Sequence, residues 1–233
     1  YFCTSCGNET SKWMGRCPAC GEWNTITEHI VQKESTSVAR RVASVPKAEP
    51  CKVQDITSET VRRIDTGNAE VNRVLGGGIV PGSLILLGGE PGIGKSTLSL
   101  QLALTDNKLH TLYVSGEESA EQIKMRATRI GIHNEECTVY TETLLENIVA
   151  EIEEEHPDIV IIDSIQTIST DLVESSPGSV TQVRECAATL LKVAKANGIA
   201  IFIIGHITKD GTIAGPKILE HIVDVVLQFE GDG

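Results

Sequence analysis

The sequence predicts an α/β protein, in which a mostly parallel β-sheet has helices on both faces and follows a small four-cysteine module. Short, almost wholly apolar runs such as Ile159–Ile162 and Ile199–Ile204 alternate with amphipathic stretches. This alternation is typical of parallel strands that helices bury on both faces. The module is indicated by the cysteines, because four of the seven fall within the first 20 residues.

Length and composition exclude several classes of protein. The chain has 233 residues, so we expect one domain of roughly 150–200 residues with a small appendage. The chain is 40% hydrophobic and 22% charged, which excludes collagen, low-complexity polymers and wholesale disorder. Its apolar runs are far shorter than the ~18 residues that span a bilayer. We therefore expect no membrane association.

The cysteine count indicates the cellular compartment of the protein, and the net charge limits how it can bind nucleic acid. Because the chain begins with Tyr1 and no basic-then-apolar stretch precedes Cys3, we expect a trimmed chain without a secretion signal. Seven cysteines then suit a reducing compartment and metal binding better than a disulfide framework. We expect a cytoplasmic protein. The net charge of −12 argues against nonspecific coating of nucleic acid, but it leaves room for a local basic path.

Three segments are expected along the chain. Residues 1–34 are rich in Cys, Gly and Trp and hold too little apolar material to form a core unaided. Residues 35–54 begin with a stretch that lacks aromatics and a clear period, and we interpret them as a linker. Residues 55–233 carry the α/β pattern.

Within the third segment, strands and helices are expected in alternation. The strands are predicted at Ser83–Leu87, Thr111–Ser115, Val139–Thr141, Asp158–Asp163, Ile199–Ile204 and Val223–Phe229. One helix follows the Gly-rich stretch after Leu87, and the next begins at a capping box of Ser119 and Gln122. Apolar spacing predicts a helix through Leu145 and Ile152 and a longer one that ends at Gly198.

The first segment has the cysteine spacing of a metal site. Cys3-x-x-Cys6 and Cys17-x-x-Cys20 are two knuckles ten residues apart, each followed by a glycine that admits a tight turn. Four thiolates in two knuckles predict a closed, structural Zn²⁺ site. A thioredoxin-type redox pair is the alternative for a single Cys-x-x-Cys, but it expects a βαβ setting.

Aromatic residues cluster in the same segment. We expect Phe2, Trp13 and Trp23 to pack around the knuckles. The alternative, in which Trp13 or Arg16 contacts nucleic acid or a partner protein, remains open.

A phosphate-binding loop follows the strand that ends at Leu87. The residues assigned to nucleotide binding are Gly89, Glu90, Pro91, Gly92, Ile93, Gly94, Lys95, Ser96 and Thr97. The first eight match the P-loop pattern between a strand and a helix, where backbone amides cradle phosphates. We expect Lys95 to reach the β- and γ-phosphates of ATP, the Ser96 hydroxyl to bind Mg²⁺, and Thr97 to contact the α-phosphate.

Other candidates for the site lie at the carboxyl ends of the predicted strands. Asp163 ends a buried strand that we expect beside the P-loop strand, where it would hold Mg²⁺. Glu117 and Glu118 follow another strand and suit the activation of water, but the sequence does not choose between them. His206 also follows a strand end, the edge where open α/β sheets bind ligands.

These motifs together resemble the bacterial RadA/Sms family of DNA-repair ATPases. The resemblance is carried by the two knuckles with Trp13-Met14-Gly15-Arg16 between them, by Gly88–Thr97, by Tyr113–Ser119, by Ser176–Val180 and by Gly205–Lys209. It implies a RecA-like core in a hexameric ring. It further implies ATP hydrolysis coupled to single-stranded DNA, and helicase-like branch migration of recombination intermediates.

The resemblance also assigns individual residues. It selects Glu117 as the catalytic glutamate and places His206 where RecA-like motors sense the γ-phosphate. The channel loops correspond to Ser175–Thr181 and Thr208–Pro216, and Lys209 and Lys217 are the expected DNA contacts. Because these loops lack aromatics, we expect backbone-directed, sequence-tolerant binding. Recombinase or replication proteins are candidate partners of the zinc module.

Two family features are missing from the sequence. The Lys-Asn-Arg-Phe-Gly motif, which is expected to serve a neighbouring subunit's ATP, would lie beyond the last strand, and a Lon-protease-like domain would follow it. We therefore expect a truncated core with weak hydrolysis and incomplete ring closure.

Two other functions fit part of these motifs. A KaiC-like ATP-driven switch without a DNA role shares the segment from Gly76 to Ser83 but does not explain the four cysteines. A zinc-ribbon transcription factor leaves the P-loop unexplained.

Overall fold

The computed structural model describes residues 2–3, 12–18, 21–23, 26–27, 52–55, 63–105, 108–206 and 219–231. The chain divides into two compact units, Tyr1–Pro46 and Lys47–Gly233. In the first unit, β1 (Phe2–Cys3) pairs antiparallel with β2 (Ile26–Thr27). The second unit contains the short 3-10 helix η1 (Val53–Asp55) and the α/β fold.

The described residues of the second unit form a six-stranded sheet in the order β5-β4-β6-β7-β3-β8. Its strands are β3 (Leu84–Gly89), β4 (Thr111–Ser115), β5 (Cys137–Tyr140), β6 (Ile159–Asp163), β7 (Ala200–His206) and β8 (Val225–Phe229). Every pairing between them is parallel. The predicted α/β class is therefore confirmed.

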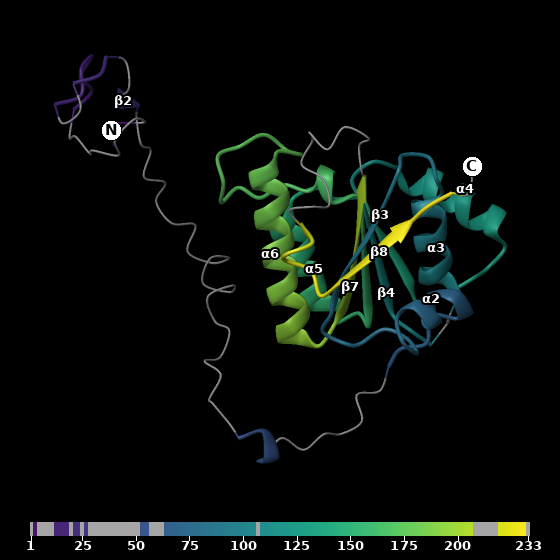
Figure 1. The fold of residues 1–233 in the computed structure, drawn as a ribbon. Helices are drawn as coiled ribbons and strands as arrows, with labels where there is room; N and C mark the ends of the chain where they lie inside the picture. Colours follow the sequence, from purple (N-terminus) through teal and green to yellow (C-terminus); the bar gives the residue numbers. More distant parts are fainter. Residues whose placement is uncertain are drawn as a thin grey trace. The chain divides into compact units, whose positions relative to one another are not determined.

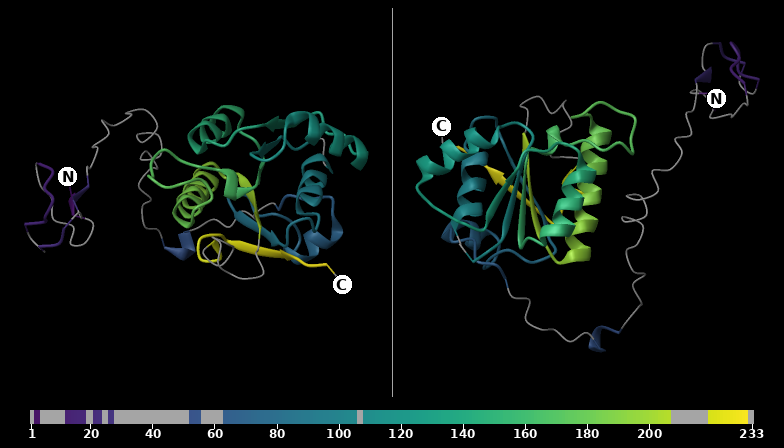
Figure 2. Two further views of the ribbon diagram at one scale, coloured as in Figure 1. Left: turned by 90° about the horizontal axis from the view of Figure 1, so that it is seen from above. Right: turned by 180° about the vertical axis from the view of Figure 1, so that it is seen from behind.

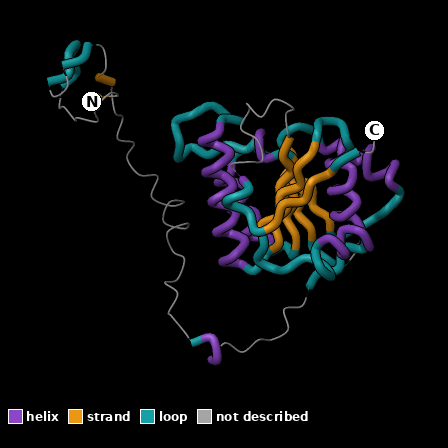
Figure 3. The backbone as a smooth tube through the Cα atoms, in the orientation of Figure 1, coloured by secondary structure: helices purple, strands orange, loops and turns teal. Residues whose placement is uncertain are grey.

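Helices cover both faces of this sheet, as Figures 1 and 2 show. On one face α5 (Leu145–Glu155) and α6 (Val180–Asn197) pack on alternate strand residues such as Leu86 and Ile162. On the other face α2 (Ala69–Val74), α3 (Lys95–Thr105) and α4 (Ala120–Ile130) pack on the intervening residues, including Ile85 and Ile161. Burial on both sides explains why the strands are continuous apolar runs. Figure 3 shows the same layers by secondary structure.

Local signals set the helix ends. The Ser119 side chain accepts a hydrogen bond from the Gln122 amide, and the Gln122 side chain accepts one from the Ser119 amide, so the predicted capping box is confirmed. Gly198 ends α6 in the left-handed conformation, with φ 67°, which glycine adopts without steric cost.

Two strands extend further than the sequence predicts. β3 continues through Gly88 and Gly89, because β7 and β8 pair with it on both sides up to Gly89. β7 likewise continues to His206, which pairs with Gly89. In the α/β fold, the sequence did not predict α2 or the 3-10 helix η2 (Ile165–Thr167).

The strand order corrects one expectation. Asp163 ends β6, which we expected to lie beside the P-loop strand β3, but β7 lies between them. Apolar patterns show that a strand is buried but carry no information on its neighbours, so the sequence could not reveal the intervening strand.

No helix among the described residues is long and apolar enough to cross a membrane.

Candidate functional site

The candidate site lies at the carboxyl edge of the sheet, where the parallel strands end together. Gly89 at the end of β3 pairs with His206 at the end of β7, and Ser115 at the end of β4 pairs with Asp163 at the end of β6. This edge is where open α/β sheets bind ligands. Strand pairing thus brings together residues that are far apart in the sequence, by 117 positions for Gly89 and His206 and by 48 for Ser115 and Asp163.

The phosphate loop connects β3 to α3. Gly92 and Gly94 have φ values of 77° and 108°, a region in which residues with a Cβ are strained. Glu90, Pro91 and Thr97 are exposed, and Ser96 is half-buried. A hollow of about 280 Å³ lies at the loop and is lined by Gly92, Gly94, Lys95, Ser96, Thr97, Arg126, Arg129 and His206.

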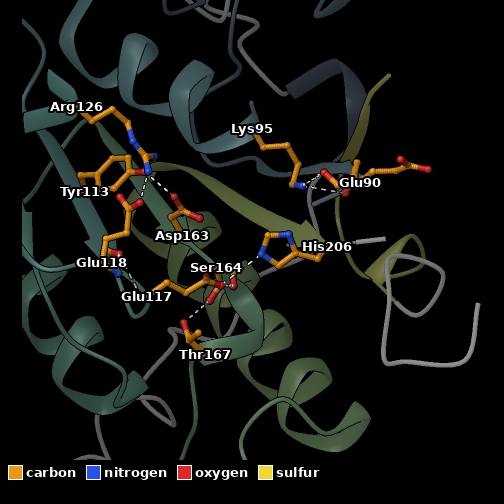
Figure 4. Close-up of polar contacts among 12 residues, drawn as sticks. Glu90, Lys95, Tyr113, Glu117, Glu118, Arg126, Asp163, Ser164, Thr167 and His206 are labelled. Carbon is orange, nitrogen blue, oxygen red and sulfur yellow. Dashed lines mark hydrogen bonds and ion pairs between the residues drawn. The ribbon is translucent and has the colours of Figure 1, made fainter. Parts of the chain in front are cut away.

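Lys95 is the buried cation of the loop. Its Nζ donates hydrogen bonds of 2.9 Å to the Gly89 carbonyl and 2.8 Å to the Glu90 carbonyl (Figure 4). Burial lowers the pKa of Lys95, while the charges of Asp163 and Glu117 act in the opposite direction. Those two carboxylates are therefore close enough to stabilise the ammonium ion.

The structure separates the two glutamates that follow β4. Glu118 forms an ion pair with Arg126, whereas Glu117 Oε1 lies 3.3 Å from His206 Nε2 and accepts a hydrogen bond from the Ser164 hydroxyl (Figure 4). The ion pair therefore holds the Glu118 side chain against α4, which carries Arg126. Glu117 is directed toward the neighbouring strand ends, and 42% of its side chain is exposed.

Besides Ser164, sequence reasoning missed Tyr113, Arg126 and Arg129. Tyr113, in the middle of β4, donates a 2.7 Å hydrogen bond to Asp163 Oδ2, and burial followed by the Asp163 charge raises the pKa of the phenol. A phenol in the middle of a predicted buried strand was the available signal, because buried hydroxyls need partners. Arg126 and Arg129 line the phosphate-loop hollow. Their i, i+3 spacing on α4 was the corresponding signal.

The expected DNA contacts are only partly within the described residues. Lys209, Lys217 and the loop Thr208–Pro216 lie outside them. The other loop, Ser175–Thr181, leads into α6, and the buried Gln182 donates hydrogen bonds from Nε2 to the carbonyls of Val173 and Ser175.

Backbone hydrogen bonds join the residues on either side of the second cysteine knuckle. Cys17 is buried, its carbonyl accepts from the Gly21 amide at 2.9 Å, and Gly21 has φ 77°. Thiolate is the donor that structural Zn²⁺ prefers. The side chain of Cys3 and all of Cys6 and Cys20 lie outside the described residues, so the four-thiolate cluster itself is not seen.

The tryptophans of this unit correct another expectation. Trp13 and Trp23 are 60% and 69% exposed, so neither is buried against the knuckles as we expected, and the side chain of Phe2 lies outside the described residues. The Arg16 guanidinium lies 5.9 Å from the Trp23 ring centroid, a cation–π contact at the surface. So small a unit has too little interior to bury an indole.

The parallel α/β/α fold and the glycine-rich loop ahead of α3 define a P-loop nucleoside triphosphatase of the RecA-like class. A family described as AAA domain matches residues 47–212, and one described as rubredoxin metal binding domain matches residues 1–28. By this match and by its relatives, the chain belongs to the AAA-domain family and, within it, to the bacterial RadA family.

The relatives are similar along the whole chain. "DNA repair protein RadA" of Halalkalibacterium halodurans is 52% identical over 237 residues, which cover 100% of this chain and 51% of that protein. The protein of the same name from Bacillus subtilis is 50% identical over 238 residues, with 100% and 52% covered. The chain thus spans about half the length of the curated relatives it matches.

A solved structure confirms the fold. The crystal structure of a KaiC-like protein from Pyrococcus horikoshii OT3 matches with a TM-score of 0.59 at 21% identity, covering 72% of this chain and 81% of that one.

Proposed function

We propose that the carboxyl edge of the sheet hydrolyses ATP. The observation that carries this proposal is the convergence of Lys95, Glu117 and His206 beside the phosphate loop, with Glu117 Oε1 3.3 Å from His206 Nε2. A buried ammonium ion, a carboxylate next to the pocket and a histidine on its wall are groups that can serve phosphoryl transfer to water.

Each group has a role in this reaction. The amides of Gly92 and Gly94 and the Lys95 ammonium bind the phosphates. Glu117 accepts a proton from the attacking water as the water oxygen bonds to the γ-phosphorus and the bond to the β,γ-bridging oxygen breaks. His206 contacts both the pocket and Glu117, which suits it to sense the γ-phosphate.

The donor set around the loop fits Mg²⁺. The Ser96 hydroxyl lines the hollow, and the Asp163 carboxylate is held at the end of β6 by Tyr113. Oxygen ligands of this kind are what Mg²⁺ prefers. When bound, the ion neutralises phosphate charge that develops during transfer. In the first unit, Cys3, Cys6, Cys17 and Cys20 are proposed to hold Zn²⁺ as a structural ion, and residues 35–54 to link the two units.

We extend the proposal to the full-length protein as a cytoplasmic, DNA-dependent motor in DNA repair. The relatives that match the entire length of this chain are named DNA repair proteins, which supports a role on DNA. The motor would act as a hexamer on single-stranded DNA, with Lys209, Lys217 and the two channel loops as contacts, and promote branch migration of recombination intermediates. Recombinase or replication proteins would bind the zinc module.

A KaiC-like switch is the second candidate. It is favoured by the structural likeness to a KaiC-like protein, although at 21% identity that likeness concerns the fold alone. In such a switch, ATP would drive an exchange of protein partners without DNA.

One experiment separates the two. The ATPase rate of the full-length protein is measured with and without single-stranded DNA, together with the salt dependence of DNA binding. For a motor, we expect single-stranded DNA to raise the ATPase rate. We also expect the logarithm of the DNA-binding constant to fall linearly with log[salt], with a slope proportional to the number of phosphate contacts. ATP turnover without stimulation, and without DNA retention at low salt, would rule out the motor and leave the switch.

A further inference from the structure

Ser164 is a fully buried hydroxyl at the candidate site, and none of the roles above uses it. It follows Asp163 directly, its side chain is inaccessible to solvent, and its Oγ donates a 2.5 Å hydrogen bond to Glu117 Oε1. Figure 4 shows it between Glu117 and Thr167. A hydrogen bond to a charged acceptor is about twice as strong as one between neutral groups.

The strand pairing explains why Ser164 and Glu117 meet. Ser115 and Asp163 are paired at the ends of the adjacent strands β4 and β6, and the Gly116 amide continues the pairing with a 3.1 Å bond to the Asp163 carbonyl. A Cβ on Gly116 would lie 2.2 Å from Thr167 Oγ1. Only glycine therefore lets the chain after β4 come this close to the corner after β6.

A second hydrogen bond holds the backbone at Ser164, directly after β6. Thr167 Oγ1 donates a 2.8 Å hydrogen bond to the Ser164 carbonyl. Ser164 is thus fixed both by burial and by η2, so its hydroxyl is a rigid donor and not a side chain free to follow Glu117.

The hydrogen bonds are distributed unequally over the Glu117 carboxylate. Oε1 accepts from Ser164 Oγ and lies 3.3 Å from His206 Nε2, which donates in this contact because a carboxylate oxygen only accepts. Oε2 has no hydrogen-bond partner among the described residues. The arrangement holds one oxygen and leaves the other free to accept a proton.

We propose that Ser164 is a positioning residue for Glu117. It anchors Oε1 at the β4–β6 corner, so that Oε2 is presented to water when His206 turns to a bound phosphate and ceases to contact the carboxylate. Ser164 then remains as the fixed support of the base throughout the reaction. The inference rests on the proposed ATPase function.

The test uses three variants of the full-length protein, assayed with ATP and single-stranded DNA. Ser164→Ala removes the hydroxyl, Ser164→Cys fills nearly the same volume with a weak donor, and Ser99→Ala is the control. Ser99 is equally buried, but its hydroxyl has no partner among the described residues. Melting temperatures establish that each variant is folded.

The two Ser164 variants are expected to lose kcat about ten-fold with little change in KM for ATP, because one charge-assisted hydrogen bond to the base is lost. Ser99→Ala is expected to keep the parent kcat. In a Glu117→Gln background, Ser164→Ala is expected to cause no further loss, because its effect passes through the carboxylate.

Three results would overturn the inference while leaving the ATPase intact. The first is a kcat for Ser164→Ala within two-fold of the parent value. The second is a parent-like kcat for Ser164→Cys, which would assign the effect to packing, and the third is an equal loss of kcat on Ser164→Ala in the parent and Glu117→Gln backgrounds. If the parent itself has no ATP turnover, the proposed function fails, and the inference fails with it.

Discussion

The hydroxyl of Tyr113 in β4 donates a 2.7 Å hydrogen bond to Asp163 Oδ2 at the end of the adjacent strand β6. Both side chains are buried, so a carboxylate that is proposed to hold Mg²⁺ has one oxygen fixed by a phenol. Burial and the nearby negative charge raise the pKa of Tyr113, so the phenol keeps its proton and remains a donor.

Tyr113→Phe removes this donor without removing the ring. We expect the free energy of unfolding to fall by about 1–3 kcal/mol, because Asp163 loses a buried partner. Urea unfolding measures the change, and Tyr140→Phe is a control on the partly buried strand β5. An unchanged unfolding midpoint would show that water replaces the phenol at no cost.

Lys95→Ala removes the buried cation of the phosphate loop. Loss of one stabiliser of developing charge lowers kcat by about 100-fold or more, and nucleotide affinity should fall as well. Steady-state ATPase assays and titration with a fluorescent ATP analogue measure the two effects. Lys124→Ala, at an exposed position of α4, is the control, and turnover in Lys95→Ala equal to that of the control would refute the site assignment.

Glu117→Gln and Glu118→Gln form a matched pair of adjacent substitutions. Because Glu117 alone is directed toward His206, Glu117→Gln should reduce kcat by about 100-fold or more while ATP still binds. Glu118→Gln should weaken the mostly buried ion pair with Arg126 and cost about 1–3 kcal/mol of stability. Assays of turnover, binding and urea unfolding on both variants check the assignment, and the reverse pattern would transfer the role to Glu118.

The buried thiol of Cys186 makes stability depend on alkaline pH. Burial, with the charges of Glu146 and Glu185, raises its pKa from 9.0 to about 12. The raised value means that the folded state keeps the proton longer than the unfolded state does. The resulting stability is complete below pH 9 and is lost as the pH rises toward 12, by about 1.4 kcal/mol per pH unit.

Urea unfolding at pH 8, 9 and 10 measures this loss. In Cys186→Ala, the free energy of unfolding should fall less between pH 9 and 10 than in the parent. This difference is independent of any pH-independent change in stability that the substitution causes. Lysines and tyrosines titrate equally in both proteins, so the difference between the two curves isolates the thiol. Parallel curves would mean that Cys186 ionises in the folded protein as readily as in the unfolded one.

Cys17→Ser tests the zinc site. We expect loss of about one zinc per chain and loosening of residues 1–34, because four thiolates close a structural site and three do not. Atomic absorption gives the metal content, and proteolysis gives the order of the segment. Cys186→Ala is the control that keeps its zinc, and unchanged metal in Cys17→Ser would exclude the four-thiolate site.

Local patterns in the sequence were sufficient for much of the fold. The strands that end at Ser115 and Asp163, the capping box at Ser119 and the helix end at Gly198 all follow from nearby residues, since burial on both faces, caps and left-handed turns leave short-range signals. The phosphate loop is likewise contained in one segment. The length of β3, by contrast, depends on pairing with β7 and β8, so its extension to Gly89 left no local signal.

The sequence by itself determined which residues are available for chemistry: a P-loop with Lys95, two glutamates after one strand, an aspartate and a histidine after two others, and two cysteine knuckles. The tertiary structure alone decided how they combine. It placed β7 between the phosphate-loop strand β3 and the strand that ends at Asp163. It paired Glu118 with Arg126, brought Glu117 into contact with Ser164 and His206, and added Tyr113 to the site. The physical reason is that strand order, register and the partners of a buried polar group are long-range properties, set by which chain segments pack together.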